Sequence, residues 1–220
     1  MTTAPEATPV NESDELVMSD NSRRAFLTKM LGGAAAVTAV SMAPASALAS
    51  TRQGAAAKAL PAGDIGILNF ALTLEHLEAS FYETAAMHFR GGYLGQLVRT
   101  LRFDEQAHVN ALTTAIRSNG GTPVAAAPRY NWPAGVFGKR AAFLKFASSL
   151  EQTGVHAYLG QAPSIKTPQI LLTAASIVTV EARHAGAIKA LQGRNPTQGA
   201  FDQGLTTQQI LKIVTPLIGK

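Results

Sequence analysis

The sequence has 220 residues, which is enough for one domain of ordinary size, and 46% of them are hydrophobic, so a sizeable core can form. It has no cysteine, which excludes disulfide scaffolds, thiolate zinc sites, iron–sulfur clusters and cysteine nucleophiles. The formal net charge is +5, but beyond residue 49 the basic residues are scattered and only Lys139 and Arg140 are adjacent, so no nucleic-acid partner is predicted.

The first 49 residues are predicted to be an export signal rather than part of a fold. Residues 1–21 are polar and acidic, which is typical of disordered segments. Arg23 and Arg24 follow as a twin-arginine pair. Residues 30–49 are uncharged and end in two small-residue cleavage motifs, Ala-Ser-Ala and Ala-Leu-Ala.

The alternative for this segment is a membrane anchor, because about 20 uncharged residues can span a bilayer. Against it, the stretch is only weakly apolar and contains Gly32, Gly33 and Pro44. We therefore expect a twin-arginine-type signal that is removed, leaving an exported protein in the periplasm or outside the cell, with no stable membrane anchor. Residues 50–63 are expected to be a linker before a domain at residues 64–220.

The rest of the chain is predicted to be helical, because apolar residues recur at helical spacing and no segment shows the alternation of a strand. The first helix is expected over about residues 64–89, with Asp64 as its N-cap. The pair Gly91 and Gly92 interrupts the chain, and a second helix follows over about residues 93–118.

A long connection follows the second helix, since residues 119–138 contain four glycines and three prolines. A third helix is expected over about residues 139–159. The connection at residues 119–138 thus separates the chain into two helical halves.

A fourth helix is expected to start at Pro168, with Thr167 as its cap, and to run to Gly193. A short last helix starts at Thr206, because Thr206 and Gln209 have the spacing of a capping box. Together these elements predict an all-α fold. It is a four-helix bundle with a long crossover between its second and third helices and a short C-terminal helix.

The chain repeats itself with an offset of 76 residues, and eight pairs of identical residues share that offset. The pairs are Phe70/Phe146, Ala71/Ala147, Leu74/Leu150, Glu75/Glu151, Tyr82/Tyr158, Glu105/Glu181, His108/His184 and Ala111/Ala187. In each half the tyrosine lies two helical turns after the first glutamate, and the histidine lies one turn after the second. Each half is therefore expected to be a helical hairpin with Glu on its first helix and Glu-x-x-His on its second.

This pattern provides the ligands of a carboxylate-bridged site for two metal ions, which takes one Glu from each of two helices and Glu-x-x-His from each of the others. The six candidate ligands are Glu75, Glu105, His108, Glu151, Glu181 and His184. We expect Glu105 and Glu181 to bridge the metals, the other two glutamates to be terminal ligands, and each metal to have one histidine. Four carboxylates balance two divalent ions, and carboxylate with imidazole suits iron or manganese.

With these motifs the sequence resembles the ferritin-like superfamily of di-iron carboxylate proteins over about residues 64–193. Within that superfamily it is most similar to exported ferritin-like domains grouped with plant desiccation-related proteins. The resemblance implies a ferritin-like fold, two divalent ions of iron or manganese, and chemistry with dioxygen or peroxide. It does not imply one reaction, since the superfamily includes ferroxidases, catalases, oxygenases and members with degraded sites.

Simpler interpretations compete with a metal site. The candidate glutamates could be solvated surface residues, and the two histidines could belong to the core. Tyr82 and Tyr158 either hydrogen-bond to ligand carboxylates or are ordinary core tyrosines. Asp104 either supports a ligand histidine across the bundle or is a surface acid, since its repeat mate is Val180. Glu78, one turn after the first candidate ligand, is predicted to be a partly exposed acid rather than a seventh ligand.

Two functions remain open from the sequence. The first is a metal-dependent oxidoreductase, ferroxidase-like or catalase-like, that reacts with dioxygen or peroxide. The second is a non-catalytic stress or desiccation-related bundle with a structural or vestigial metal site. Only a measurement of turnover distinguishes the two.

Overall fold

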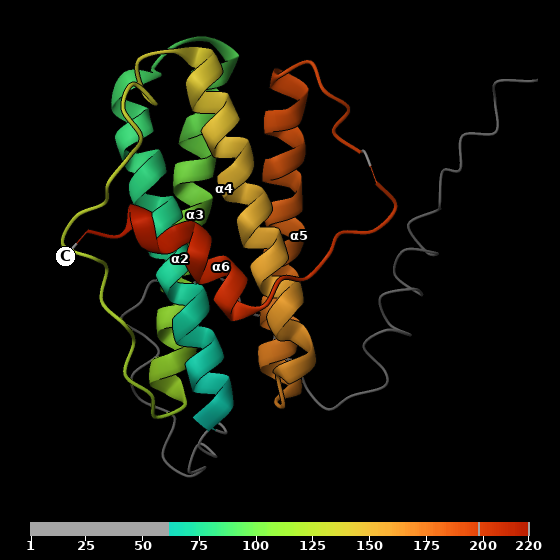
Figure 1. The fold of residues 1–220 in the computed structure, drawn as a ribbon. Helices are drawn as coiled ribbons and strands as arrows, with labels where there is room; N and C mark the ends of the chain where they lie inside the picture. Colours follow the sequence, from blue (N-terminus) through green and yellow to red (C-terminus); the bar gives the residue numbers. More distant parts are fainter. Residues whose placement is uncertain (1–61, 198, 220) are drawn as a thin grey trace, which may run out of the picture. The chain divides into compact units, whose positions relative to one another are not determined.

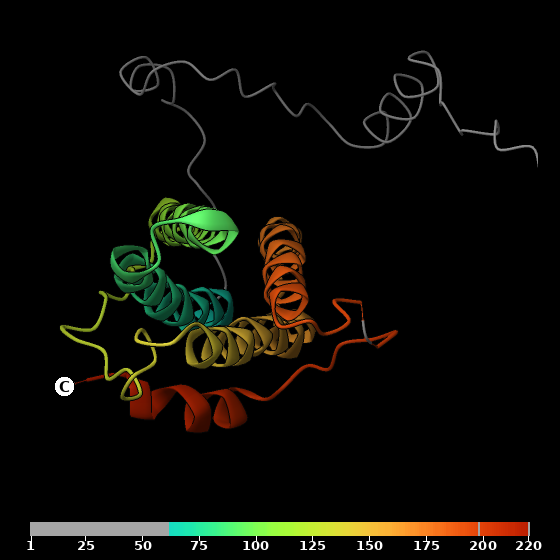
Figure 2. The same ribbon diagram turned by 90° about the horizontal axis from the view of Figure 1, so that it is seen from above.

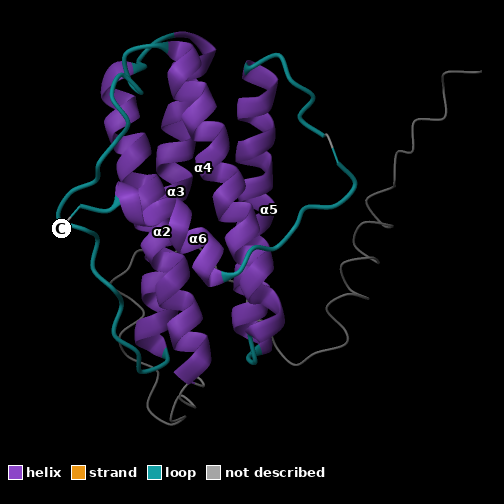
Figure 3. Cartoon of the chain, in the orientation of Figure 1, coloured by secondary structure: helices purple, strands orange, loops and turns teal. Residues whose placement is uncertain are grey.

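The computed structural model describes residues 62–197 and 199–219, so the predicted signal and nearly all of the predicted linker lie outside the described residues. Its helices are α2 (Ala62–His88), α3 (Gly92–Ser118), α4 (Arg140–Gln161), α5 (Pro168–Leu191) and α6 (Thr207–Val214), with 3₁₀ turns at Ala162–Ser164 and Thr215–Leu217. The described residues form helices and loops without a strand (Figure 3). None of these helices is long and apolar enough to cross a bilayer.

The four long helices lie side by side as two antiparallel hairpins (Figure 1). α2 packs along α3, and α4 packs along α5. A view along the helix axes shows that α2 also lies beside α4, which brings the two hairpins together (Figure 2). The short helix α6 packs against α4, and its Ile210 and Val214 are fully buried in the core. The predicted all-α four-helix bundle is confirmed.

The long crossover at residues 119–139 runs along the bundle from the end of α3 to the start of α4 (Figure 1). As a result, α4 runs parallel to α3 and antiparallel to α2. The crossover is fixed to the end of the chain, because the Asn131 N–H donates to the Leu217 carbonyl at 2.7 Å. It is also fixed to the core, because the Trp132 ring packs edge-on against Phe81 with ring centroids 5.3 Å apart. The loop predicted from glycines and prolines therefore has one defined path.

Two apolar clusters fill the bundle, one toward each end. Leu72 on α2 and Leu112 on α3 belong to one cluster, and Phe81 on α2 and Leu101 on α3 belong to the other. On α3 and α5 the candidate ligands lie between residues of one cluster and residues of the other, which marks a middle level of the bundle. The candidate ligands occupy this middle level, with apolar packing on both sides.

The structure corrects the prediction that Asp64 is an N-cap. The helix begins two residues earlier, and Asp64 lies in its first turn. Its two carboxylate oxygens instead accept the backbone N–H groups of Lys166 and Thr167, both at 2.9 Å. Thr167 is the N-cap residue of α5, but its own side chain makes no capping hydrogen bond. Asp64 therefore binds the start of the fourth helix from the first helix, a partner 102 residues away that local spacing does not indicate.

Replacing Asp64 should destabilise the fold through the start of α5. We expect Asp64→Ala to lower the free energy of unfolding by about 1–2 kcal/mol, because two backbone donors lose their acceptor. Asp64→Asn should cost less, since its one amide oxygen can still accept. Urea unfolding measures both. Glu83→Ala serves as the control, because Glu83 is exposed in a surface ion pair with Arg102 and should change stability by less than about 0.5 kcal/mol. An Asp64→Ala value equal to the control value would contradict the prediction.

Candidate metal centre

All six candidate ligands lie inside the bundle at the same level. The four helices supply them as predicted: Glu75 on α2, Glu105 and His108 on α3, Glu151 on α4, and Glu181 and His184 on α5. The four glutamates are fully buried, and the two histidines are no more than 8% exposed. The interpretation as surface acids is therefore wrong for these positions.

The ligand atoms gather into two groups that share two glutamates. One group is Glu75, Glu105, His108 and Glu181, and the other is Glu105, Glu151, Glu181 and His184. Within each group, the ligand atoms all lie within 4.8 Å of one another. Because Glu105 and Glu181 belong to both groups, they have the placement expected of bridging carboxylates.

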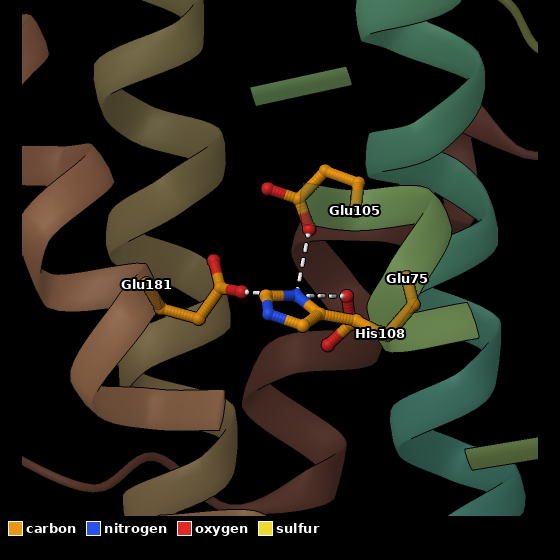
Figure 4. Close-up of side chains that lie close together, drawn as sticks. All are labelled: Glu75, Glu105, His108 and Glu181. Atoms are coloured by element: carbon orange, nitrogen blue, oxygen red, sulfur yellow. Dashed lines mark hydrogen bonds and ion pairs between the residues drawn. The ribbon is translucent and has the colours of Figure 1, made fainter. Parts of the chain in front are cut away.

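His108 lies between three carboxylates (Figure 4). Its Nδ1 is 3.0 Å from Glu181, 3.1 Å from Glu105 and 3.2 Å from Glu75, measured to one oxygen of each. One ring nitrogen carries at most one proton and can share it well with only one acceptor. Three carboxylate oxygens surround this nitrogen, so at most one of them can accept its proton well and the other two need a different positive partner.

His184 has the equivalent position in the other half. Its Nδ1 is 3.0 Å from Glu105 and 3.3 Å from Glu151. Its second nitrogen, Nε2, is hydrogen-bonded to the Asp104 carboxylate at 3.2 Å, and Asp104 reaches across from α3. This contact fixes the ring so that Nδ1 faces the carboxylates, which is how carboxylates support metal-binding histidines. Val180 occupies the repeat-equivalent position of Asp104 and has no carboxylate, so the two halves differ here.

The two tyrosines connect the halves in a crosswise manner. Tyr82 on α2 donates its hydroxyl hydrogen bond to Glu151 on α4, and Tyr158 on α4 donates to Glu75 on α2. Burial raises the pKa of both hydroxyls well above the ordinary value, and the neighbouring glutamate charges raise it further. The hydroxyls therefore remain protonated donors that hold the terminal carboxylates in place. Of the two readings that the sequence left open, the structure shows tyrosines bound to candidate ligands.

Burial and mutual repulsion make the carboxyl groups hold protons. Burial raises the pKa of Glu78 and of Glu181 well above the ordinary value, and the nearby charges of other glutamates, with Glu105 first for Glu181, raise it further. Burial also raises the pKa of Glu151, although its contact with His184 opposes that rise. Without a cation, the cluster therefore keeps protons on carboxyl groups at neutral pH.

The histidines shift in the direction that favours their charged form. Burial alone would lower the pKa of His108, but its close contacts with three glutamates, Glu105 first, raise the pKa to about 12. For His184, contacts with Glu105 and Glu151 likewise outweigh burial and raise the pKa to about 11. Positive charge is thus strongly favoured at this level of the bundle.

The buried polar atoms that lack a hydrogen-bond partner test whether a metal fits. Among the described residues they are Glu78 Oε2, Glu105 Oε1, Glu151 Oε2, both Glu181 oxygens and His184 Nδ1. All belong to this cluster, although such atoms normally find partners in folded proteins. The His184 and Glu105 atoms are only 3.0 Å apart but are not aligned as a hydrogen bond. These carboxylate oxygens and the imidazole nitrogen point their lone pairs at one another without a donor between them. Such a set of ligand atoms fits two divalent cations.

The structure also corrects the prediction for Glu78. Its side chain is 2% exposed and so belongs to the interior, not to the surface. Leu68, Leu72, Glu75 and Tyr82 recur with it at intervals of three or four residues, which forms one buried stripe of α2. Its repeat mate is a glycine, so the symmetry that identified the six candidate ligands excluded it. The helical spacing from the first ligand was the signal that could have found it.

Comparison with known proteins agrees with the fold. The profile of the ferritin-like domain family matches residues 63–194. Among solved structures, the conserved hypothetical protein rv2844 from Mycobacterium tuberculosis is similar, with 22% sequence identity and a TM-score of 0.55, covering 63% of this chain and 96% of that one. No curated protein matches the chain significantly. The family match spans more than half of the chain and includes all six candidate ligands, so the protein belongs to the ferritin-like domain family.

Proposed function

We propose that this protein holds two divalent metal ions, iron or manganese, and that the bound pair reacts with dioxygen or peroxide. The observation that carries the proposal is the pair of ligand groups that share Glu105 and Glu181 and contain buried acceptors without donors. Bound there, a metal pair supplies Lewis acidity and electrons for oxidation chemistry. A cluster of buried carboxylates without cations would be costly to maintain.

The protein's own residues hold and shield the ions. Tyr82 and Tyr158 orient the terminal carboxylates, and Asp104 orients one imidazole. The apolar clusters on both sides exclude water from the middle of the bundle. Asp104 on α3, which contacts His184 on α5, has a side chain that is 31% exposed, while the ligand carboxylates are fully covered. A small oxidant is expected to approach from there.

We also propose that the protein works outside the cytoplasm. The support is the sequence of residues 1–49, with its twin-arginine pair, uncharged stretch and cleavage motifs. A twin-arginine-type signal exports folded proteins, so a metal pair buried between four helices could be in place before export.

Anaerobic loading with Fe²⁺ tests the metal part of the proposal. Elemental analysis of the desalted protein should approach two equivalents of iron per chain. A value near zero in a protein with the expected helical circular dichroism would contradict a di-metal centre.

Exposure of the loaded protein to dioxygen or peroxide tests the reaction. The iron should oxidise in a burst that is faster than the oxidation of the same iron in buffer. The burst should persist in Tyr82→Phe, because this tyrosine orients a ligand without being one. If the protein binds two irons but oxidises them no faster than buffer does, the oxidation proposal is wrong, and the alternative of a non-catalytic bundle with a structural metal site replaces it.

A further inference from the structure

Glu78 is a buried carboxyl group that the six-ligand set does not use. It projects from α2, is 2% exposed, and has an oxygen, Oε2, with no hydrogen-bond partner. The charges that act on it come from Glu181, Glu105, Glu75 and Glu151, which are the four carboxylates of the candidate centre. A buried acid with no donor of its own, surrounded by ligand carboxylates, must share whatever neutralises them.

The position of Glu78 along the bundle follows from the crossed tyrosine contacts. Tyr82 reaches Glu151, and Tyr158 reaches Glu75, so the eight-residue stretches 75–82 of α2 and 151–158 of α4 run past each other in opposite directions. The middle of the α2 stretch, at Glu78, therefore lies level with the middle of the α4 stretch. That level is the centre of the repeat symmetry, between the two ligand groups.

The α4 residue facing this point is a glycine, and the space beside it is where Glu78 lies. A Cβ atom on Gly154 would be 3.2 Å from Glu78 Oε1 and 3.5 Å from Glu181 Oε2. The first distance is tighter than an ordinary van der Waals contact. The absence of a side chain at Gly154 thus makes room for one carboxylate beside Glu181, which belongs to both ligand groups.

We propose that Glu78 is a seventh protein ligand, a fifth carboxylate placed at the centre of the site where it serves the metal pair rather than one ion. The proposal rests on the proposed di-metal function and goes beyond it. Five carboxylates carry a charge of −5, one more than two divalent ions supply.

Titration with Co²⁺ tests whether Glu78 is a ligand, because the visible absorption of Co²⁺ changes in intensity with its coordination number. The wild-type protein should take up two Co²⁺ ions. Glu78→Gln keeps the size of the side chain but removes the charge, and it should weaken binding of at least one ion by about tenfold or more and change the absorption spectrum. Gly154→Ala keeps the carboxylate but crowds it, and it should change the spectrum in the same direction. Glu83→Gln, an exposed glutamate of the same helix, should match the wild type.

Melting temperatures separate a ligand role from a structural role. If Glu78 is a ligand, Glu78→Gln should melt at an equal or higher temperature than the wild type without metal and at a lower temperature with Co²⁺. A purely structural glutamate would lower both temperatures, and that result would overturn the proposal. Wild-type affinity and spectrum in Glu78→Gln would also overturn it while leaving the di-metal function intact. No uptake of Co²⁺ by the wild type would overturn both.

Discussion

Without bound metal, the protein should become steadily less stable as the pH rises from about 5 to 9, whereas the metal-loaded protein should not. The pKa of Glu78 and of Glu181 is raised in the folded state, so these groups keep protons that the unfolded chain releases above its value of about 4.3. The same holds for His108 and His184 above about 6.5, because their folded pKa values are about 12 and 11. A folded state that binds more protons than the unfolded state loses stability as the pH rises.

The expected effect is large because several groups act in the same direction. Each retained proton contributes a slope of about 1.4 kcal/mol per pH unit. Bound divalent ions replace these protons, so metal-loaded protein should escape the loss and gain further stability from binding. Melting curves with and without metal at several pH values measure the difference. A gap in melting temperature that stays constant over this pH range would show that metal and protons do not compete for one buried cluster.

The same competition predicts release of protons when metal binds. At pH 7 the two imidazolium groups must each lose a proton to bind metal, so at least two protons should leave per chain. Calorimetric titration in two buffers with different ionisation enthalpies counts them. The apparent affinity should consequently rise with pH.

Glu105→Ala should remove both metal ions, whereas His108→Ala should remove mainly one. Glu105 belongs to both ligand groups, and its Oε1 and Oε2 point to different histidines, 3.0 Å from His184 and 3.1 Å from His108. His108 belongs to one group alone. We therefore expect iron content to fall from about two equivalents toward zero in the first variant and toward one in the second. The oxidation burst should vanish in Glu105→Ala.

Two controls accompany this pair of variants: circular dichroism to check that they fold, and the variant Glu181→Ala at the position that the repeat relates to Glu105. Circular dichroism should show that both variants keep the helices of the wild type. In Glu105→Ala, the loss of a buried carboxylate also relieves repulsion in the metal-free protein. Glu181→Ala should behave like Glu105→Ala, since the repeat relates the two residues. Equal iron loss in Glu105→Ala and His108→Ala would contradict the assignment of Glu105 as a bridge.

The sequence predicted the helices and the clustering of the six candidate ligands, because both depend on regular spacing. Helical periodicity placed the helix ends within two residues, since apolar faces and glycine or proline breaks are local signals. The 76-residue offset then identified ligands far apart in the chain, because a duplicated hairpin must repeat its functional positions. For Asp104 the repeat gave no support, because its mate is Val180; of the two alternatives that the sequence left open, the structure shows the contact with a histidine across the bundle, at 3.2 Å.

The sequence did not predict the two features that depend on one specific neighbour. Asp64 had the residue type of a helix cap, but its partners on the loop before α5 are brought close only by the tertiary fold. Glu78 had no repeat mate, and a pattern based on identity discards a position where the two halves differ. Burial of a charged side chain cannot be read from its own residue type, because it depends on the space that the facing helix leaves.

The difference between Glu78 and Gly154 has a consequence for how such a bundle can be assembled. In a symmetric dimer of identical hairpins, each copy would carry the same residue at this central level. Two glutamates there would bring two carboxylates into the space that now holds one, and two glycines would leave none. Joining the hairpins covalently frees each half to carry its own residue. The covalent link therefore permits an odd number of buried carboxylates in a cluster whose other members are paired by the repeat.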